Sequence, residues 1–355
     1  MSGQPAVAGQ PGSATDQPSE PASATQPSAE PPARIEQAEA PRAPASAEPP
    51  AAPQAVAPAP PAPVAAPPLP DAPTPPPLPA RAVIQPDRPI APPDPALQEA
   101  GRYGPLPRVG PDGRTPVRAY SRAFDRSDTR PRIGIVMGGM GLSESFSDEA
   151  IRRLPGAVGL AFSPYASRND GLLDRARARG MELLSALPLE PAGYPINDPG
   201  EWALLTGISP EQNIDRLDWT LSRLQGQVGA VGALGAMRGE RFAAVPDLIG
   251  LVQDHLRSRG LLYIDPRPGA GNPERAWGRG VDVVIDEPAT RGEIDRRLAE
   301  LERIARDKGS ALGIAADPAP VTVERLTSWA STLAERGLVL APVSVMIRRP
   351  EGQPR

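Results

Sequence analysis

The segment IGIVMGGMGL at residues 133–142 decides the fold. Its first half is a short apolar run rich in β-branched side chains, which is typical of a buried strand. The glycines at 138, 139 and 141 predict a tight turn that needs the backbone freedom of glycine. The same order of strand, turn and helical pattern recurs along the chain. Residues 131–348 are therefore expected to form one α/β domain.

The whole domain shows this alternation of strands and helices. We expect strands over residues 133–137, 158–162, 182–184, 228–230, 262–264, 282–285, 311–314 and 338–341. Segments of period near 3.6 separate most of them, with apolar stripes at Ile214, Leu217, Leu221 and Leu224 and at Ile294, Leu298, Leu301 and Ile304. Ser209 and Thr290 stand three residues before Gln212 and Glu293, a spacing that predicts capping boxes.

Regular alternation implies right-handed crossovers and a mainly parallel sheet. Seven or eight such units favour closure into a (β/α) barrel, and an open doubly wound sheet is the alternative.

The chain before the domain has a different composition. Most of the 51 prolines of the whole chain precede residue 131. Residues 49–79 alternate Pro and Ala and contain few large apolar side chains to bury. Such a segment cannot offset the entropy of ordering its backbone, so residues 1–100 are predicted to be a disordered Pro/Ala-rich arm. Residues 101–130 keep Tyr103, Leu106 and Tyr120 among turn signals. We expect an irregular strap against the domain there.

Composition excludes several classes of function. The chain has no cysteine, which rules out disulfides, zinc–thiolate sites and thiol catalysis. The net charge is −4 with acids and bases interspersed and no basic block, so nucleic acid is not expected as a partner. No apolar run is long enough to span a membrane. A Pro-rich spacer usually separates a domain from something, which suggests an anchor upstream and a periplasmic or membrane-anchored location.

The motifs at the strand ends carry a resemblance. They are residues 133–142, LAFSPY at 160–165, GMELLSALPLEP at 180–191, LYIDPR at 262–267 and GSALGI at 309–314. Their order and spacing resemble the divergent polysaccharide deacetylase family of bacterial envelope proteins, from about residue 104 to 345. The resemblance implies a polysaccharide-deacetylase-like distorted (β/α) barrel and N-acetylated glycans as the substrate class.

The resemblance also shows what this chain lacks. Metal-dependent relatives place two aspartates after the first strand, and these align with Gly138 and Gly139. Histidines of the family fall at Ala186, at Ala233 and around residues 315–317. The chain has a single histidine, His255, on a predicted helix face. Because metal-assisted deacetylation needs several ligands on one ion together with an acid and a base, no metal, no cofactor and no deacetylation are expected.

Other polar signals remain at the strand ends. The GGMG run at 138–141 fails the spacing of a dinucleotide-binding loop. Glu190, Asp265, Arg267 and Asp286 lie at or just past predicted strand ends and are the candidate binding residues. Asp265 and Arg267, two apart on a strand, would also suit a structural ion pair.

Three functions are compatible with the sequence. The leading one is a non-catalytic deacetylase-like domain that binds envelope glycan or an envelope protein. The second is a metal-independent carbohydrate-active hydrolase that uses Glu190 with Asp265 or Asp286 as acid and base. The third is a structural envelope scaffold.

Overall fold

The computed structural model describes residues 88–167, 170–232, 235 and 238–350. Most of the segment predicted to be a disordered arm, residues 1–87, lies outside this range. None of the described helices is long and apolar enough to cross a membrane.

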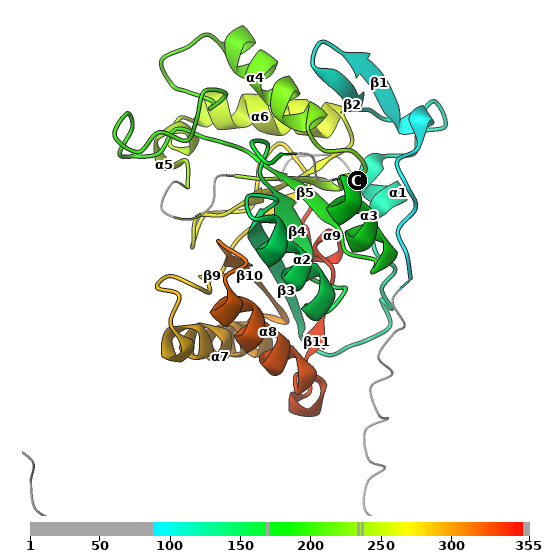
Figure 1. Cartoon of the computed structure of the whole chain (residues 1–355), viewed down its shortest axis with the longest axis vertical. Helices are drawn as coiled ribbons and strands as arrows, with labels where there is room; N and C mark the ends of the chain where they lie inside the picture. The colour runs from blue at the N-terminus through cyan, green and yellow to red at the C-terminus, as the bar shows by residue number, and fades with distance from the viewer. Residues whose placement is uncertain (1–87, 168–169, 233–234, 236–237, 351–355) are drawn as a thin grey trace, which may run out of the picture. The chain divides into compact units, whose positions relative to one another are not determined.

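A curled parallel sheet of nine strands forms the centre of the domain (Figure 1). In sheet order, eight of its strands are β8 (Gly278–Gly280), β7 (Leu262–Asp265), β6 (Gly229–Val231), β5 (Leu183–Ala186), β4 (Gly159–Phe162), β3 (Arg132–Met140), β10 (Ser310–Ala315) and β9 (Val283–Val284). The ninth, β11 (Val339–Leu340), also pairs with β3. All these pairs are parallel. The predicted fold class, an α/β distorted barrel with a mainly parallel sheet, is confirmed.

The crossover helices follow the strands in order. They are α2 (Glu144–Arg153), α3 (Asp170–Ala178), α4 (Pro210–Ser222), α5 (Glu240–Ala243), α6 (Pro246–Ser258), α7 (Arg291–Lys308) and α8 (Pro320–Ser331), followed by the turn η2 (Ala334–Arg336) and by α9 (Val343–Met346). Figure 1 shows α4 beside α6 at one end of the view and α7 beside α8 at the other.

Capping residues explain where α4 and α7 begin. The capping box at Ser209 is complete, since its hydroxyl accepts from Gln212 N and its own N–H donates to Gln212 Oε1. Thr290 caps α7 by accepting from Glu293 N. The Glu293 side chain instead pairs with Arg296 and Arg297.

Alternate strand residues face two different cores. Val136 of β3, Leu184 of β5, Ile264 of β7 and Leu312 of β10 belong to one buried cluster, which joins strands far apart in the sheet order. Such contacts are expected inside a curled sheet. The intervening residues of β3, including Ile135, pack in a second cluster with residues of α2, α7 and α8.

Residues 88–130 contain regular structure as well. They form η1 (Pro95–Leu97), an antiparallel pair of β1 (Gln98–Gly101) with β2 (Gly104–Pro107), and α1 (Pro116–Tyr120). Tyr103 attaches this segment to α4 through a 2.6 Å hydrogen bond from its hydroxyl to Asp215. Arg259 of the turn after α6 contacts Glu99 at 2.8 Å.

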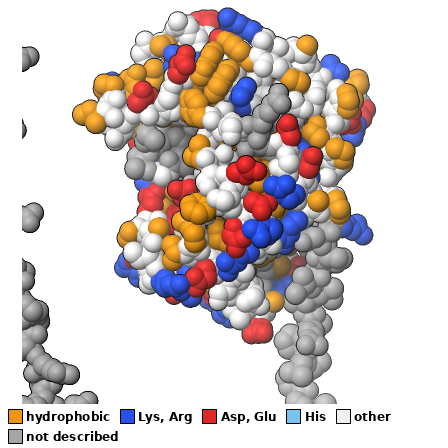
Figure 2. All heavy atoms as spheres, in the orientation of Figure 1, with side chains coloured by type: hydrophobic (Ala, Val, Ile, Leu, Met, Phe, Trp, Pro, Cys, Tyr) orange, Lys and Arg blue, Asp and Glu red, His pale blue; other side chains and the backbone are white. Residues whose placement is uncertain are grey.

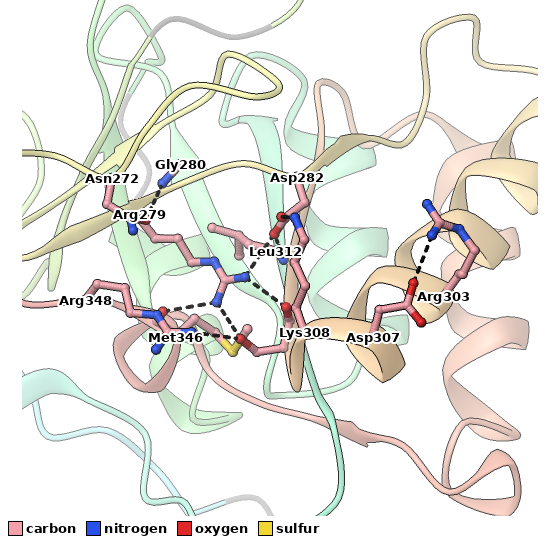
Figure 3. Close-up of polar contacts among 11 residues, drawn as sticks. Asn272, Arg279, Gly280, Asp282, Arg303, Asp307, Lys308, Leu312, Met346 and Arg348 are labelled. Atoms are coloured by element: carbon pink, nitrogen blue, oxygen red, sulfur yellow. Dashed lines mark hydrogen bonds and ion pairs between the residues drawn. The ribbon is translucent and has the colours of Figure 1, made fainter.

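The two edges of the sheet meet at a polar seam around Arg279 of β8 (Figure 3). Between the edge strands β8 and β9, Val281 N donates to Asp265 O of β7 and Asp282 N donates to Leu312 O of β10. The Arg279 guanidinium reaches across the seam to Asp282 Oδ2 at 3.0 Å and to Ser310 Oγ at 2.9 Å. Burial is the main influence on Arg279 and lowers its pKa. This buried cation therefore joins both edges of the barrel.

Charged side chains mix over the surface. On the face in Figure 2, Lys and Arg side chains lie beside Asp and Glu side chains, with apolar patches between them. Asp148 of α2 illustrates the pattern, because it pairs with Arg152 at 3.0 Å and with Arg175 of α3 at 2.8 Å.

Candidate functional site

The carboxyl end of β3 holds Gly138 and Gly139, the two glycines at which the resemblance predicts the aspartates of metal-dependent relatives. Gly139 has a φ of +64°, in the left-handed region that favours glycine. A Cβ atom placed on it would lie 2.5 Å from Oδ1 of Asp317 and 3.1 Å from the carbonyl oxygen of Ala316. The loop after β10 therefore covers the place where a ligand side chain would stand.

A pair of carboxylates lies at this same edge. Asp286, which follows β9, is 5% exposed and accepts from the backbone N–H groups of Ala316 at 2.8 Å and Asp317 at 3.2 Å. Burial raises the pKa of Asp286, and the neighbouring negative charge of Asp317 adds to this shift. Partial burial also raises the pKa of the more exposed Asp317. Asp317 was not among the predicted candidates, although it lies where the resemblance predicts the family's late motif.

Glu190 lies in the loop after β5 and is 3% exposed. One carboxylate oxygen accepts from Thr206 N, and the other contacts Nε of the half-exposed Arg241 at 3.1 Å. The backbone oxygen of Glu190 accepts from Phe242 N of α5 at 3.1 Å. Glu190 thus connects the loop before α4 to α5.

Asp265 and Arg267 form the pair expected from their spacing. Oδ1 of Asp265 accepts from the backbone N and from Nε of Arg267, both at 3.0 Å, and Oδ2 accepts from Nη2 at 2.7 Å. The hydrogen bond to Asp265 raises the pKa of Arg267. Asp265 is 5% exposed, so its carboxylate is buried. Among the described residues, its hydrogen bonds come from Arg267.

Each of the candidate carboxylates is bonded to partners of its own. No hydrogen bond or ion pair joins Glu190, Asp265 and Asp286 to one another in the part of the chain that the structure describes. Asp265 and Arg267 are brought together as predicted from their spacing.

The residues present do not fit the metal that the family implies. Gly138, Gly139 and Ala186 carry no ligand atoms in their side chains, and Ala233 lies outside the described residues. Among the residues that are described, no three His, Cys, Asp or Glu side chains are grouped to hold a metal ion. His255 instead contacts Asp218 at 2.8 Å and accepts from Arg259 at 2.9 Å.

A polar crevice, which sequence reasoning missed, lies on the outer side of β5. It has a volume of about 250 Å³ and runs between α3 and α4, with Ser163, Asp170, Ser185, Thr220 and Arg223 in its wall. Ser185 Oγ and Thr220 Oγ1 are buried and have no hydrogen-bond partner among the described residues. Buried polar groups are normally bonded, so each unpaired hydroxyl invites an external partner.

An aromatic cluster adjoins this crevice. The rings of Trp202 and Trp219 stack with centroids 4.9 Å apart, and Tyr165 lies 5.5 Å from Trp219. Tyr165 is 40% exposed and follows two of the crevice residues, Ser163 and Pro164, in sequence. Neither the ring cluster nor the crevice was predictable, because they join residues from three separate segments.

Comparisons with known proteins place the chain. The family model for divergent polysaccharide deacetylases matches residues 135–347. This chain belongs to the divergent polysaccharide deacetylase family. The resemblance seen in the strand-end motifs is therefore confirmed.

Three proteins show how this family member relates to others. An uncharacterized protein of Haemophilus influenzae is 24% identical over 217 residues, which cover 59% of this chain and 74% of that protein. The crystal structure of an uncharacterized protein from Agrobacterium tumefaciens C58 is 33% identical with a TM-score of 0.63, covering 68% of this chain and 99% of that one. The catalytic domain of a peptidoglycan N-acetylglucosamine deacetylase from Eubacterium rectale has a TM-score of 0.44 and 10% identity, over 66% of this chain and 96% of that domain.

Proposed function

We propose that this member of the divergent polysaccharide deacetylase family binds an N-acetylated glycan and does not deacetylate it through a metal. The observation that carries the proposal is the short distance between Asp317 and the point where a Cβ atom on Gly139 would stand. An aspartate at position 139 would meet the carboxylate of Asp317 and the carbonyl of Ala316. The chain thus lacks the ligand side chain, and Asp317 and its neighbours would have to shift to admit one.

The crevice supports binding of a sugar. Sugar hydroxyls both donate and accept hydrogen bonds, so they can pair with Ser185 Oγ and Thr220 Oγ1. Leaving such a buried group unpaired costs about 1–3 kcal/mol, and a bound ligand recovers part of this cost. The exposed ring of Tyr165 and the guanidinium of Arg223 add apolar contact and further donors beside the crevice.

The hydrolytic alternative has less support. Glu190 is paired with Arg241 and Asp265 with Arg267, so both carboxylates are already engaged in ion pairs. Burial raises the pKa of Asp286, and its carboxylate accepts from two backbone amides. An acid–base pair would require one of these intramolecular contacts to break.

Calorimetric titration of the whole chain with N-acetylated chito-oligosaccharides tests the proposal. Thr220→Val keeps the shape of the side chain and removes the hydroxyl, so binding should weaken about tenfold for one lost hydrogen bond. Thr322→Val is the matched control, since Thr322 Oγ1 of α8 is also buried and has no partner among the described residues but does not line the crevice. Equal binding by the two variants would contradict the crevice as the site. Release of acetate on addition of a divalent metal would overturn the non-catalytic assignment.

A further inference from the structure

A second and larger cavity lies at the opposite end of the strands from the candidate site. Its volume is about 790 Å³, within the range of about 300–1,000 Å³ usual for small-molecule sites. Its wall includes α1 and the segment after it, Gly260 and Leu261 just before β7, Trp277 just before β8, and part of α9. The cavity is therefore formed at the amino ends of the strands.

The wall of this cavity carries positive charge only. Four arginines line it, at positions 118, 122, 126 and 257, and no Asp or Glu is among the described lining residues. The chain as a whole has a net charge of −4, so the positive charge of the cavity wall is opposite in sign to the charge of the whole protein. A hollow lined by one sign of charge concentrates ions of the opposite sign.

Two of these arginines have no counter-ion among the described residues. Within the described part of the chain, the side chains of Arg118 and Arg126 make no ion pair or hydrogen bond, and both are exposed. Arg257 pairs at 3.0 Å with Asp254, and both side chains of that pair are open to solvent. Arg122 is used differently, because its Nη1 donates to the backbone oxygens of Arg179 and Gly180. Arg118 and Arg126 are thus the groups available to an anion.

An apolar surface accompanies the arginines. Trp277 is 44% exposed although it is a large aromatic side chain, and Phe124, Val345 and Ile347 line the same hollow. The face of an indole ring packs against flat or apolar groups, and it also attracts cations such as guanidinium groups. Planar guanidinium groups suit the oxygens of a phosphate ester, to which they can donate two hydrogen bonds at once.

We propose that this cavity binds a phosphate ester with an apolar body, with Arg118 and Arg126 on the phosphate and Trp277 on the apolar part. This proposal is independent of glycan binding at the crevice. A soluble phosphorylated molecule and the phosphate headgroup of a lipid share this chemistry.

Phenyl phosphate is the probe for the soluble form, titrated calorimetrically into the full chain with inorganic phosphate and phenol as comparisons. We expect saturable binding of phenyl phosphate at one site per chain, at least tenfold tighter than either comparison. The double variant Arg118→Gln, Arg126→Gln should weaken it at least tenfold, and Trp277→Ala should reduce its advantage over inorganic phosphate. Arg303→Gln on α7, an exposed arginine outside the cavity, is the control and should have no effect.

Vesicles distinguish the two sources. Co-sedimentation with phosphatidylcholine vesicles that contain phosphatidic acid, lost in the double variant and absent with phosphatidylcholine alone, assigns the site to a lipid phosphate. Binding of phenyl phosphate without co-sedimentation assigns it to a soluble ester. Failure of both probes, or an equal loss with Arg303→Gln, would overturn the proposal. Binding of chito-oligosaccharides by the double variant should equal that of the wild type, whether the phosphate site takes a lipid or a soluble ester.

Discussion

Oδ1 of Asp317 lies 2.5 Å from the point where a Cβ atom on Gly139 would stand. This short distance lies between the end of β3 and the loop after β10. Strands β3 and β10 are paired in the sheet. Position 139 is where metal-dependent relatives are expected to carry an aspartate. The position of the Asp317 carboxylate therefore depends on the absence of a side chain at position 139.

Gly139→Ala should destabilise the fold more than the same change at a glycine with open surroundings. Gly113 is the matched control, because its φ of +75° is similar and nothing lies within 4 Å of the point where its Cβ atom would stand. The left-handed backbone alone costs about 1–2 kcal/mol for an alanine. We expect that cost for Gly113→Ala and roughly 1–3 kcal/mol more for Gly139→Ala, where the new methyl group overpacks against Asp317. Urea unfolding measures both, and equal costs would show that the loop after β10 yields freely.

Asp286→Asn should change how stability depends on pH. The folded-state pKa of Asp286 is raised by burial, so the unfolded chain releases this proton at a lower pH than the folded chain. Wild-type stability therefore falls as the pH rises from the unfolded pKa through the folded one. The variant escapes this loss, so its stability relative to wild type should rise over the same window, by about 1.4 kcal/mol for each pH unit between the two pKa values. A constant difference from pH 3 to pH 7 would contradict the raised pKa.

Arg267→Ala separates a structural role from a binding role. Asp265 is buried, and the variant leaves it with the backbone amide of residue 267 as its one hydrogen-bond donor among the described residues. We expect a loss of about 2–4 kcal/mol, at or below the range for a broken buried pair because Arg267 is partly exposed. Arg102→Ala, which removes an exposed partner of Asp215, should cost less than about 1 kcal/mol. A small loss of stability with weakened chito-oligosaccharide binding would instead place Arg267 in the glycan site.

Arg279→Ala should open the seam of the barrel. The guanidinium is buried and bonds to Asp282 and Ser310, so its removal leaves the Asp282 carboxylate at the junction of β8 and β9 with the exposed Lys308, 3.9 Å away, as its remaining ion-pair partner among the described residues. The expected cost is about 3–5 kcal/mol. Arg303→Ala breaks the exposed pair with Asp307 that Figure 3 also shows, and should cost about 0.5 kcal/mol or less. Chemical denaturation of both variants checks this, and similar costs would mean that the seam holds without Arg279.

Much of the architecture was predictable because it depends on local patterns. Apolar runs and their spacing predicted eight of the nine strands of the parallel sheet, and the capping residues predicted where α4 and α7 begin. Strand β8 was missed because its sequence, Gly-Arg-Gly, has no apolar periodicity. Its position depends on pairing with β7 and on the buried bonds of Arg279.

The sequence by itself determined the fold class and the family, since periodicity, motif order and residue identity need no third dimension. Only the tertiary structure decided which partners the polar groups find. It placed Asp317 against Gly139, left the hydroxyls of Ser185 and Thr220 without partners among the described residues, and gathered Arg118 and Arg126 beside Trp277. Such contacts join residues from dozens to well over a hundred positions apart. Strand register and helix packing bring these residues together, and neither property is written in any one segment of the chain.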